Sequence, residues 1–160
     1  LLLMFRIKQT ALFVFIAVIA VLLTSAADVY ASDLVVEKPW ARASIGVSRP
    51  TAVYLTIRNG GAVTDVLTMV TTPAAGMAEV HKSEVKDGLA RMSPAGNVEV
   101  SAGTTAILEP GGLHIMLMEL KNPLKKGETI SMTLHFENAG PVDVAVPVYG
   151  IAASGPKFSD

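Results

Sequence analysis

The chain has 160 residues, no cysteine, and 13 basic against 14 acidic side chains, which gives a formal net charge of −1. A charge so close to zero, without a basic cluster, argues against nucleic acid as a partner. Without a thiol, we expect no disulfide framework, no lipid anchor on a cysteine, no iron–sulfur cluster and no His₂Cys electron-transfer copper centre.

The N-terminal segment has the pattern of an export signal. Arg6 and Lys8 precede an apolar run over residues 11–23, and small residues before and at Ala31 have the small-x-small form of a signal-peptidase site. The run is shorter than the ~20 apolar residues that a membrane span requires. We therefore expect residues 1–31 to be a cleaved signal peptide, although cleavage a few residues earlier or an uncleaved anchor also fits. The mature chain should then be periplasmic, without a membrane span.

From Leu34 onward, short runs of β-forming residues alternate with turns rich in Gly, Pro, Asn and Asp. No segment has helical periodicity over ten or more residues. Pro147 predicts that the last strand lies at a sheet edge, because proline cannot donate to a ladder. The expected strands cover residues 51–58, 65–70, 76–82, 89–92, 98–100, 105–108, 114–120, 129–136 and 142–148.

Seven to nine short strands predict an all-β fold, either a sandwich or a small Greek-key barrel. We found no internal repeat or linker, so residues 34–150 are expected to form a single domain. Residues 151–160 are small and polar, and we expect them to form a loose tail.

Four histidine and methionine residues form a spaced set. His81, Met92, His114 and Met116 are separated by 10, 21 and 1 residues. Two imidazoles and two thioethers make a soft, uncharged ligand set, which suits Cu(I) better than Mg²⁺, Ca²⁺ or a structural Zn²⁺. This set predicts a copper site.

The predicted strands explain how these four residues can meet. The Asp87-Gly88 turn predicts a hairpin that places Met92 opposite His81 or nearly so. His114 and Met116 are two residues apart on one strand, so their side chains share a face. Two hairpin elements would then each contribute one histidine and one methionine.

The remaining histidine and methionines of the predicted domain receive other assignments. Met69 and Met132 are expected to fill the core, and His135 lies on the polar face of its strand. Met77 shares the strand face of His81, and Met118 shares that of His114. Either of these two methionines remains an alternative additional ligand.

The chain resembles the PCu(A)C periplasmic copper chaperones, whose ligand motif H-x₁₀-M-x₂₁-H-x-M is reproduced without a gap by His81, Met92, His114 and Met116. The similarity runs from about residue 35 to residue 148. It includes Trp40-Ala41-Arg42 and the Pro-Gly-Gly-Leu-His-Ile-Met-Leu stretch at 110–117. The resemblance implies a cupredoxin-like fold, one exposed Cu(I) site per chain formed by those four residues, and copper supply to a respiratory oxidase.

The resemblance also implies partners and leaves two alternatives. The copper acceptor would be the oxidase subunit that carries a dinuclear copper centre, a Sco-like thioredoxin-fold protein, or both. Copper buffering or resistance would use the same site without a specific acceptor, and a metal-free β-sandwich interaction module would make the spacing accidental.

The sequence has no nucleophile elbow and no His-Glu-x-x-His run, so we expect no enzyme. Residues 152–160 contain no His or Met, which predicts a single high-affinity site.

Overall fold

Ten β-strands and no helix make up residues 33–156, the part of the chain that the computed structural model describes. The expected signal peptide at 1–31 lies outside these described residues. Within them, no helix long and apolar enough to cross a membrane occurs. The prediction of an all-β fold is confirmed. The strands are β1 Leu34–Arg42, β2 Thr51–Asn59, β3 Asp65–Thr71, β4 Ala75–Lys86, β5 Leu89–Pro94, β6 Val98–Val100, β7 Thr105–Leu108, β8 Leu113–Leu120, β9 Thr129–Phe136 and β10 Gly140–Tyr149.

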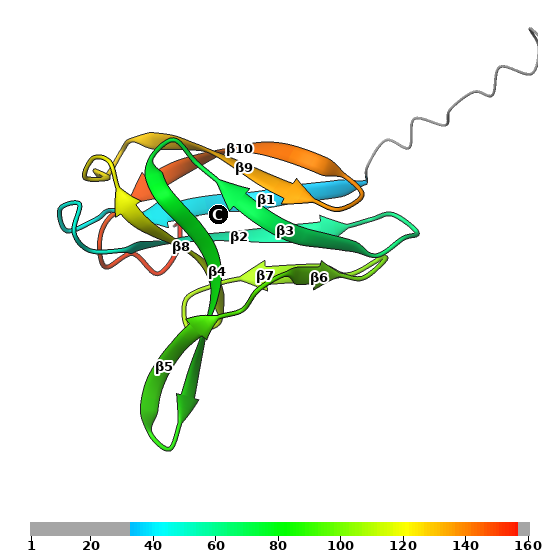
Figure 1. Cartoon of the computed structure of the whole chain (residues 1–160), viewed down its shortest axis with the longest axis horizontal. Coiled ribbons are helices and arrows are strands. Elements are labelled where there is room, and N and C mark those ends of the chain that lie inside the picture. Colours follow the sequence, from blue (N-terminus) through cyan, green and yellow to red (C-terminus); the bar gives the residue numbers. More distant parts are fainter. Residues whose placement is uncertain (1–32, 157–160) are drawn as a thin grey trace, which may run out of the picture. The chain divides into compact units, whose positions relative to one another are not determined.

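The strands follow the order β5-β4-β8-β2-β1-β10-β9-β3-β6, and β7 also pairs with β2 (Figure 1). One sheet contains β5, β4, β8, β2 and β1, with β7 also paired to β2, and the second contains β10, β9, β3 and β6. All neighbours are antiparallel except β1 and β10, which meet in parallel through Ala41 with Val148 and Arg42 with Tyr149. This short parallel contact connects the two sheets of the sandwich.

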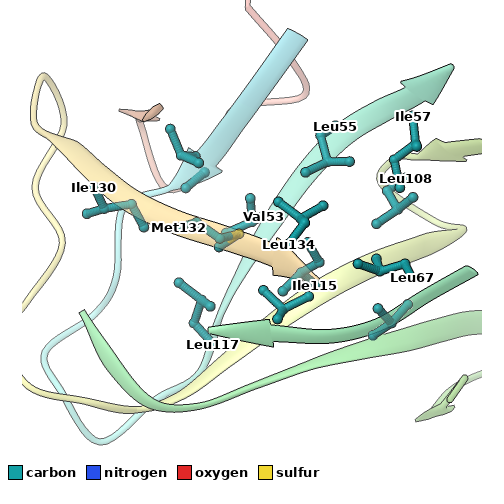
Figure 2. Close-up of a cluster of buried hydrophobic side chains, with 14 of the residues drawn as sticks. Val53, Leu55, Ile57, Leu67, Leu108, Ile115, Leu117, Ile130, Met132 and Leu134 are labelled. Atoms are coloured by element: carbon teal, nitrogen blue, oxygen red, sulfur yellow. The ribbon is translucent and has the colours of Figure 1, made fainter. Parts of the chain in front are cut away.

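Side chains from both sheets fill the space between them (Figure 2). On β9, alternate residues from Ile130 to Phe136 are buried, as the two-residue period of a strand requires. Met132 is 1% exposed, which confirms its assignment to the core. Burying one such apolar side chain contributes about 1.5–3 kcal/mol. The labelled core residues come from the first sheet (Val53, Leu55, Ile57, Leu108, Ile115, Leu117) and from the second (Leu67, Ile130, Met132, Leu134).

The assignment of Met69 to the core is wrong. The side chain of Met69 is 53% exposed. The pairing of β3 with β9 shifts register between Leu67 and Met69, so two consecutive residues lie between the buried Leu67 and the buried Val70. A bulge of this kind breaks the two-residue alternation on which the prediction depended.

The edge position predicted from Pro147 is also wrong, because β10 lies between β9 and β1. Pro147 is the last residue of β10 to pair with β9, opposite Thr129. The parallel pairing with β1 begins one residue later, at Val148. Proline is therefore tolerated at the point where β10 leaves one sheet and joins the other.

Candidate metal centre

A row of ring side chains crosses the outer face of the first sheet. Trp40 of β1 pairs with Tyr54 of β2, and His81 of β4 pairs with His114 of β8. The ring centroids are 4.4 Å apart for Trp40 and Tyr54, 6.3 Å for Tyr54 and His114, and 6.2 Å for His114 and His81. The two histidines of the predicted set therefore lie side by side at one end of an aromatic row.

His114 is placed by a bulge between β7 and β8. Strand β2 pairs with β7 up to Leu108 and with β8 from Ile115 onward. The partners of Leu108 and Ile115 on β2 are only two residues apart. Residues 109–114 therefore leave the ladder of β2. Residues 109–112 form a loop, whereas Leu113 and His114 already belong to β8 and pair with β4. The loop is closed by two backbone hydrogen bonds, from Glu109 N to Leu113 O at 2.8 Å and from Gly112 N to Glu109 O at 3.0 Å.

Replacing Gly111 in this loop with alanine is expected to lower the free energy of unfolding by about 1–2 kcal/mol. Gly111 has a φ of +86°, in the left-handed region where a Cβ costs about that much. The matched control is Gly112→Ala, because Gly112 lacks a positive φ and its added Cβ would meet its nearest atoms at 3.7 Å. Urea unfolding followed by circular dichroism measures both, and an equal loss in the two variants would contradict the expectation.

The tautomer of His114 follows from its surroundings. Its Nδ1 lies 3.1 Å from the carbonyl oxygen of Gly112, and a carbonyl can only accept, so Nδ1 carries the proton. In the neutral imidazole, Nε2 then holds a lone pair. This Nε2 is buried and has no hydrogen-bond partner among the described residues. Burying an unpaired nitrogen costs about 1–3 kcal/mol, and a bound metal ion would satisfy it.

His81 lies next to a carboxylate. Its Nε2 is 3.4 Å from Oε2 of Glu79, which is longer than an ordinary hydrogen bond. The side chain of His81 is 14% exposed and that of Glu79 is 48% exposed. The carboxylate places negative charge beside the His81 imidazole and would offset part of the charge of a cation bound there.

The two methionines of the set differ in exposure. Met116 lies opposite Ala52 of β2 and Glu79 of β4 and is half-buried. Met92 lies on β5 opposite Ser83 and is 62% exposed. Every residue of β5 is exposed, and the hairpin of β4 and β5 extends away from the neighbouring strands (Figure 1).

A surface pocket of about 440 Å³ brings three of the four predicted residues together. His114, Met116 and Met92 are among its lining residues. His81 lies outside that lining but beside the ring of His114. The structure therefore gathers all four residues in one region, around the histidine whose Nε2 has no partner.

The sequence did not identify Arg42 and Tyr54 as neighbours of this region. Both line the same pocket, and the guanidinium carbon of Arg42 lies 5.4 Å from the centroid of the Tyr54 ring. Arg42 Nε also donates to the carbonyl oxygen of Ala153 at 2.9 Å. Burial raises the pKa of the Tyr54 phenol above its usual value, and the Arg42 guanidinium opposes part of this rise. Strand alternation does predict Tyr54 on the outward face of its strand, but only the strand order places that face beside His114.

The described part of the chain contains no cluster of three or more of the side chains that commonly bind hard metal ions. No group of three or more His, Cys, Asp or Glu side chains between residues 33 and 156 could hold a metal ion. Thioether sulfur, the other donor type present in this region, favours Cu(I).

Comparison with known proteins identifies relatives that cover most of the chain. The family model described as "Putative lipoprotein LpqE-like" matches residues 34–148. Over 129 residues the chain is 36% identical to "Putative lipoprotein Lxx21020" of Leifsonia xyli subsp. xyli, covering 80% of this chain and 76% of that protein.

Two solved structures extend the comparison to the fold. The apo PCuAC domain from PmoF1 is 30% identical with a TM-score of 0.62, over 76% of this chain and 98% of that one. The solution structure of CuI-DR1885 from Deinococcus radiodurans is 32% identical with a TM-score of 0.53, over 78% and 85% of the two chains. The described residues thus share their sandwich with PCuAC domains.

Proposed function

Because this chain belongs to the LpqE-like family and has the cupredoxin-like fold of PCuAC domains, we propose that it is an extracytoplasmic Cu(I)-binding chaperone. The observation that carries the proposal is the buried Nε2 of His114, which has a free lone pair beside His81 and no partner among the described residues. A soft cation would occupy that position at the centre of the predicted ligand set.

The proposed ligands of one Cu(I) ion are His81, Met92, His114 and Met116. Both imidazoles and both thioethers are uncharged, and Cu(I) prefers soft ligands of low charge. The relative DR1885 is described with Cu(I), which supports the choice of metal and oxidation state. This four-residue set supports one tightly bound ion per chain.

Transfer of the ion is proposed to proceed by ligand exchange at the exposed methionine. His114 is 3% exposed whereas Met92 is 62% exposed, so the Met92 side of the set is open to an acceptor. Each bond to a ligand of this chain is replaced by a bond to a ligand of the acceptor. The ion remains Cu(I) throughout, and no electron moves, so the protein acts as a carrier and not as an enzyme.

The proposed location is the periplasm or an equivalent extracytoplasmic space. The family and the curated relative are both described as lipoproteins, which supports an extracytoplasmic place of work. None of the 160 residues is a cysteine, so no residue of this sequence can carry the lipid of a lipoprotein. The proposed route is export by the N-terminal signal segment at residues 1–31 followed by cleavage.

The proposed acceptor is a copper-binding oxidase subunit, a Sco-like thioredoxin-fold protein, or both, and a deletion strain tests this. We expect the strain to lose respiratory oxidase activity in copper-limited medium and to regain it when copper is added. A strain that expresses the His135→Ala protein serves as the control, because His135 is hydrogen-bonded to Thr71 on the other sheet. Normal oxidase activity combined with sensitivity to excess copper would favour buffering and contradict delivery.

A further inference from the structure

Two methionines outside the predicted ligand set lie directly opposite one another. Met77 of β4 pairs with Met118 of β8 in the antiparallel register. Directly opposite residues have Cβ atoms about 4.5–5.5 Å apart, a separation at which two flexible thioethers can reach one ion. Met77 is 41% exposed and Met118 is half-buried.

This pair continues the candidate metal centre along the sheet. On β8, His114, Met116 and Met118 occupy alternate positions and therefore share one face. Met116 precedes Met118 by two residues, a distance of about 7 Å along the strand. Met116 also lies opposite Glu79, which is two residues from Met77 on β4. Three thioethers thus occupy neighbouring positions on one surface.

Packing of the sandwich does not account for the pair. The intervening residues Ala78 and Leu117 face inward and belong to the core or pack against it, whereas neither Met77 nor Met118 does. An outward position on a solvated sheet ordinarily carries a polar or β-branched residue. Two unbranched thioethers at opposed outward positions instead provide a pair of soft donors.

We propose that Met77, Met118 and Met116 form a second, weaker Cu(I) station, through which the ion enters or leaves the four-residue site. The inference rests on the proposed function. Three neutral thioethers make a soft ligand set for Cu(I), and the nearby Glu79 carboxylate offsets part of the positive charge. The lack of imidazole ligands makes this station weaker than the four-residue site.

The ion would move between the stations by exchange of ligands. Its bond to Met116 is kept, while the bonds to the two imidazoles and to Met92 are replaced by bonds to Met77 and Met118. Copper remains Cu(I), and no proton or electron is transferred. Since Met116 belongs to both sets, the two stations are used in succession.

The first test uses protein labelled with ¹³C at the methionine methyl groups, in the His81→Ala/His114→Ala variant. Anaerobic titration with Cu(I) is expected to shift the methyl resonances of Met77, Met116 and Met118 together. Those of Met69 and Met132, on the other sheet, should stay in place. Unchanged resonances of Met77 and Met118 in a variant with a dispersed, folded spectrum would overturn the inference.

The second test keeps the imidazoles and removes the station. In Met77→Leu/Met118→Leu, release of Cu(I) to a colorimetric chelator is expected to slow severalfold with little change in equilibrium affinity. The matched control is Met69→Leu, an exposed methionine with no methionine opposite. A release rate equal to that of the wild type would overturn the inference. Absence of tight one-to-one binding by the wild type would instead overturn the proposed function, so the two failures can be told apart.

Discussion

Replacing His114 with alanine is expected to weaken Cu(I) binding by at least about 100-fold. Loss of a group that only supports a metal ligand typically costs 10–100-fold in affinity, and His114 is proposed to bind the ion itself. The hydrogen bond from Nδ1 to the Gly112 carbonyl fixes its tautomer, and no other described residue supplies a nitrogen at that position. An anaerobic competition titration of the purified protein against a colorimetric Cu(I) chelator measures the change.

The matched control for this experiment is His135→Ala. His135 is half-buried on β9 and is hydrogen-bonded to Thr71 at 3.0 Å, on the sheet that does not carry the pocket. We expect this variant to bind Cu(I) as the wild type does, and His81→Ala to behave like His114→Ala. Wild-type affinity in His114→Ala would remove the central ligand of the proposed site.

Replacing both Met92 and Met116 with leucine is expected to abolish tight Cu(I) binding while the fold is preserved. Leucine has nearly the volume of methionine, so the exchange should change the free energy of unfolding by less than about 1.5 kcal/mol. It removes the sulfur, and with it the preference for Cu(I). We expect each single replacement to weaken binding less than the double replacement does. Chelator competition and thermal unfolding together separate affinity from stability.

The control for the methionine variants is Met132→Leu. Met132 is 1% exposed in the core, so this exchange tests the effect of removing a thioether away from the site. We expect unchanged Cu(I) affinity. A double variant that still binds one Cu(I) tightly would show that the two thioethers are not ligands. The metal-free sandwich described from the sequence would then account better for this surface.

Nine of the ten strands, β2 to β10, were predictable because alternation and turn chemistry are local, whereas β1 at Leu34–Arg42 was not among the expected strands. On β9 every second residue is buried, as the pattern of residues 129–136 indicates. The wrong assignments of Met69 and Pro147 both depended on pairing that the sequence does not contain. A register shift turned Met69 outward, and the position of β10 between two sheets accommodated Pro147. Local pattern therefore predicts a strand well and its neighbours poorly.

The spacing of the four histidine and methionine residues predicted which side chains form the candidate site, but not how these side chains differ in exposure. Nothing in the spacing distinguishes His114, which is 3% exposed, from Met92, which is 62% exposed. That difference arises because His114 lies on β8, which is flanked by β4 and β2, whereas Met92 lies on the edge strand β5. Likewise, the proximity of Tyr54 to His114 depends on β2 and β8 being neighbours, which is a non-local property.

The loop between β7 and β8, residues 109–112, can change without changing the strands of the fold. Metal preference can therefore be adjusted there while the sandwich is maintained. The ladder of β2 is complete on both sides of the bulge, up to Leu108 and again from Ile115. Insertions or deletions at residues 109–112 would change the Gly112 carbonyl contact that orients the His114 imidazole, while the pairing of His114 with His81 could stay in register. A lineage, or a designer, can therefore retune this centre for another soft ion by editing the four residues 109–112 between β7 and β8, with little risk to the stability of the sandwich.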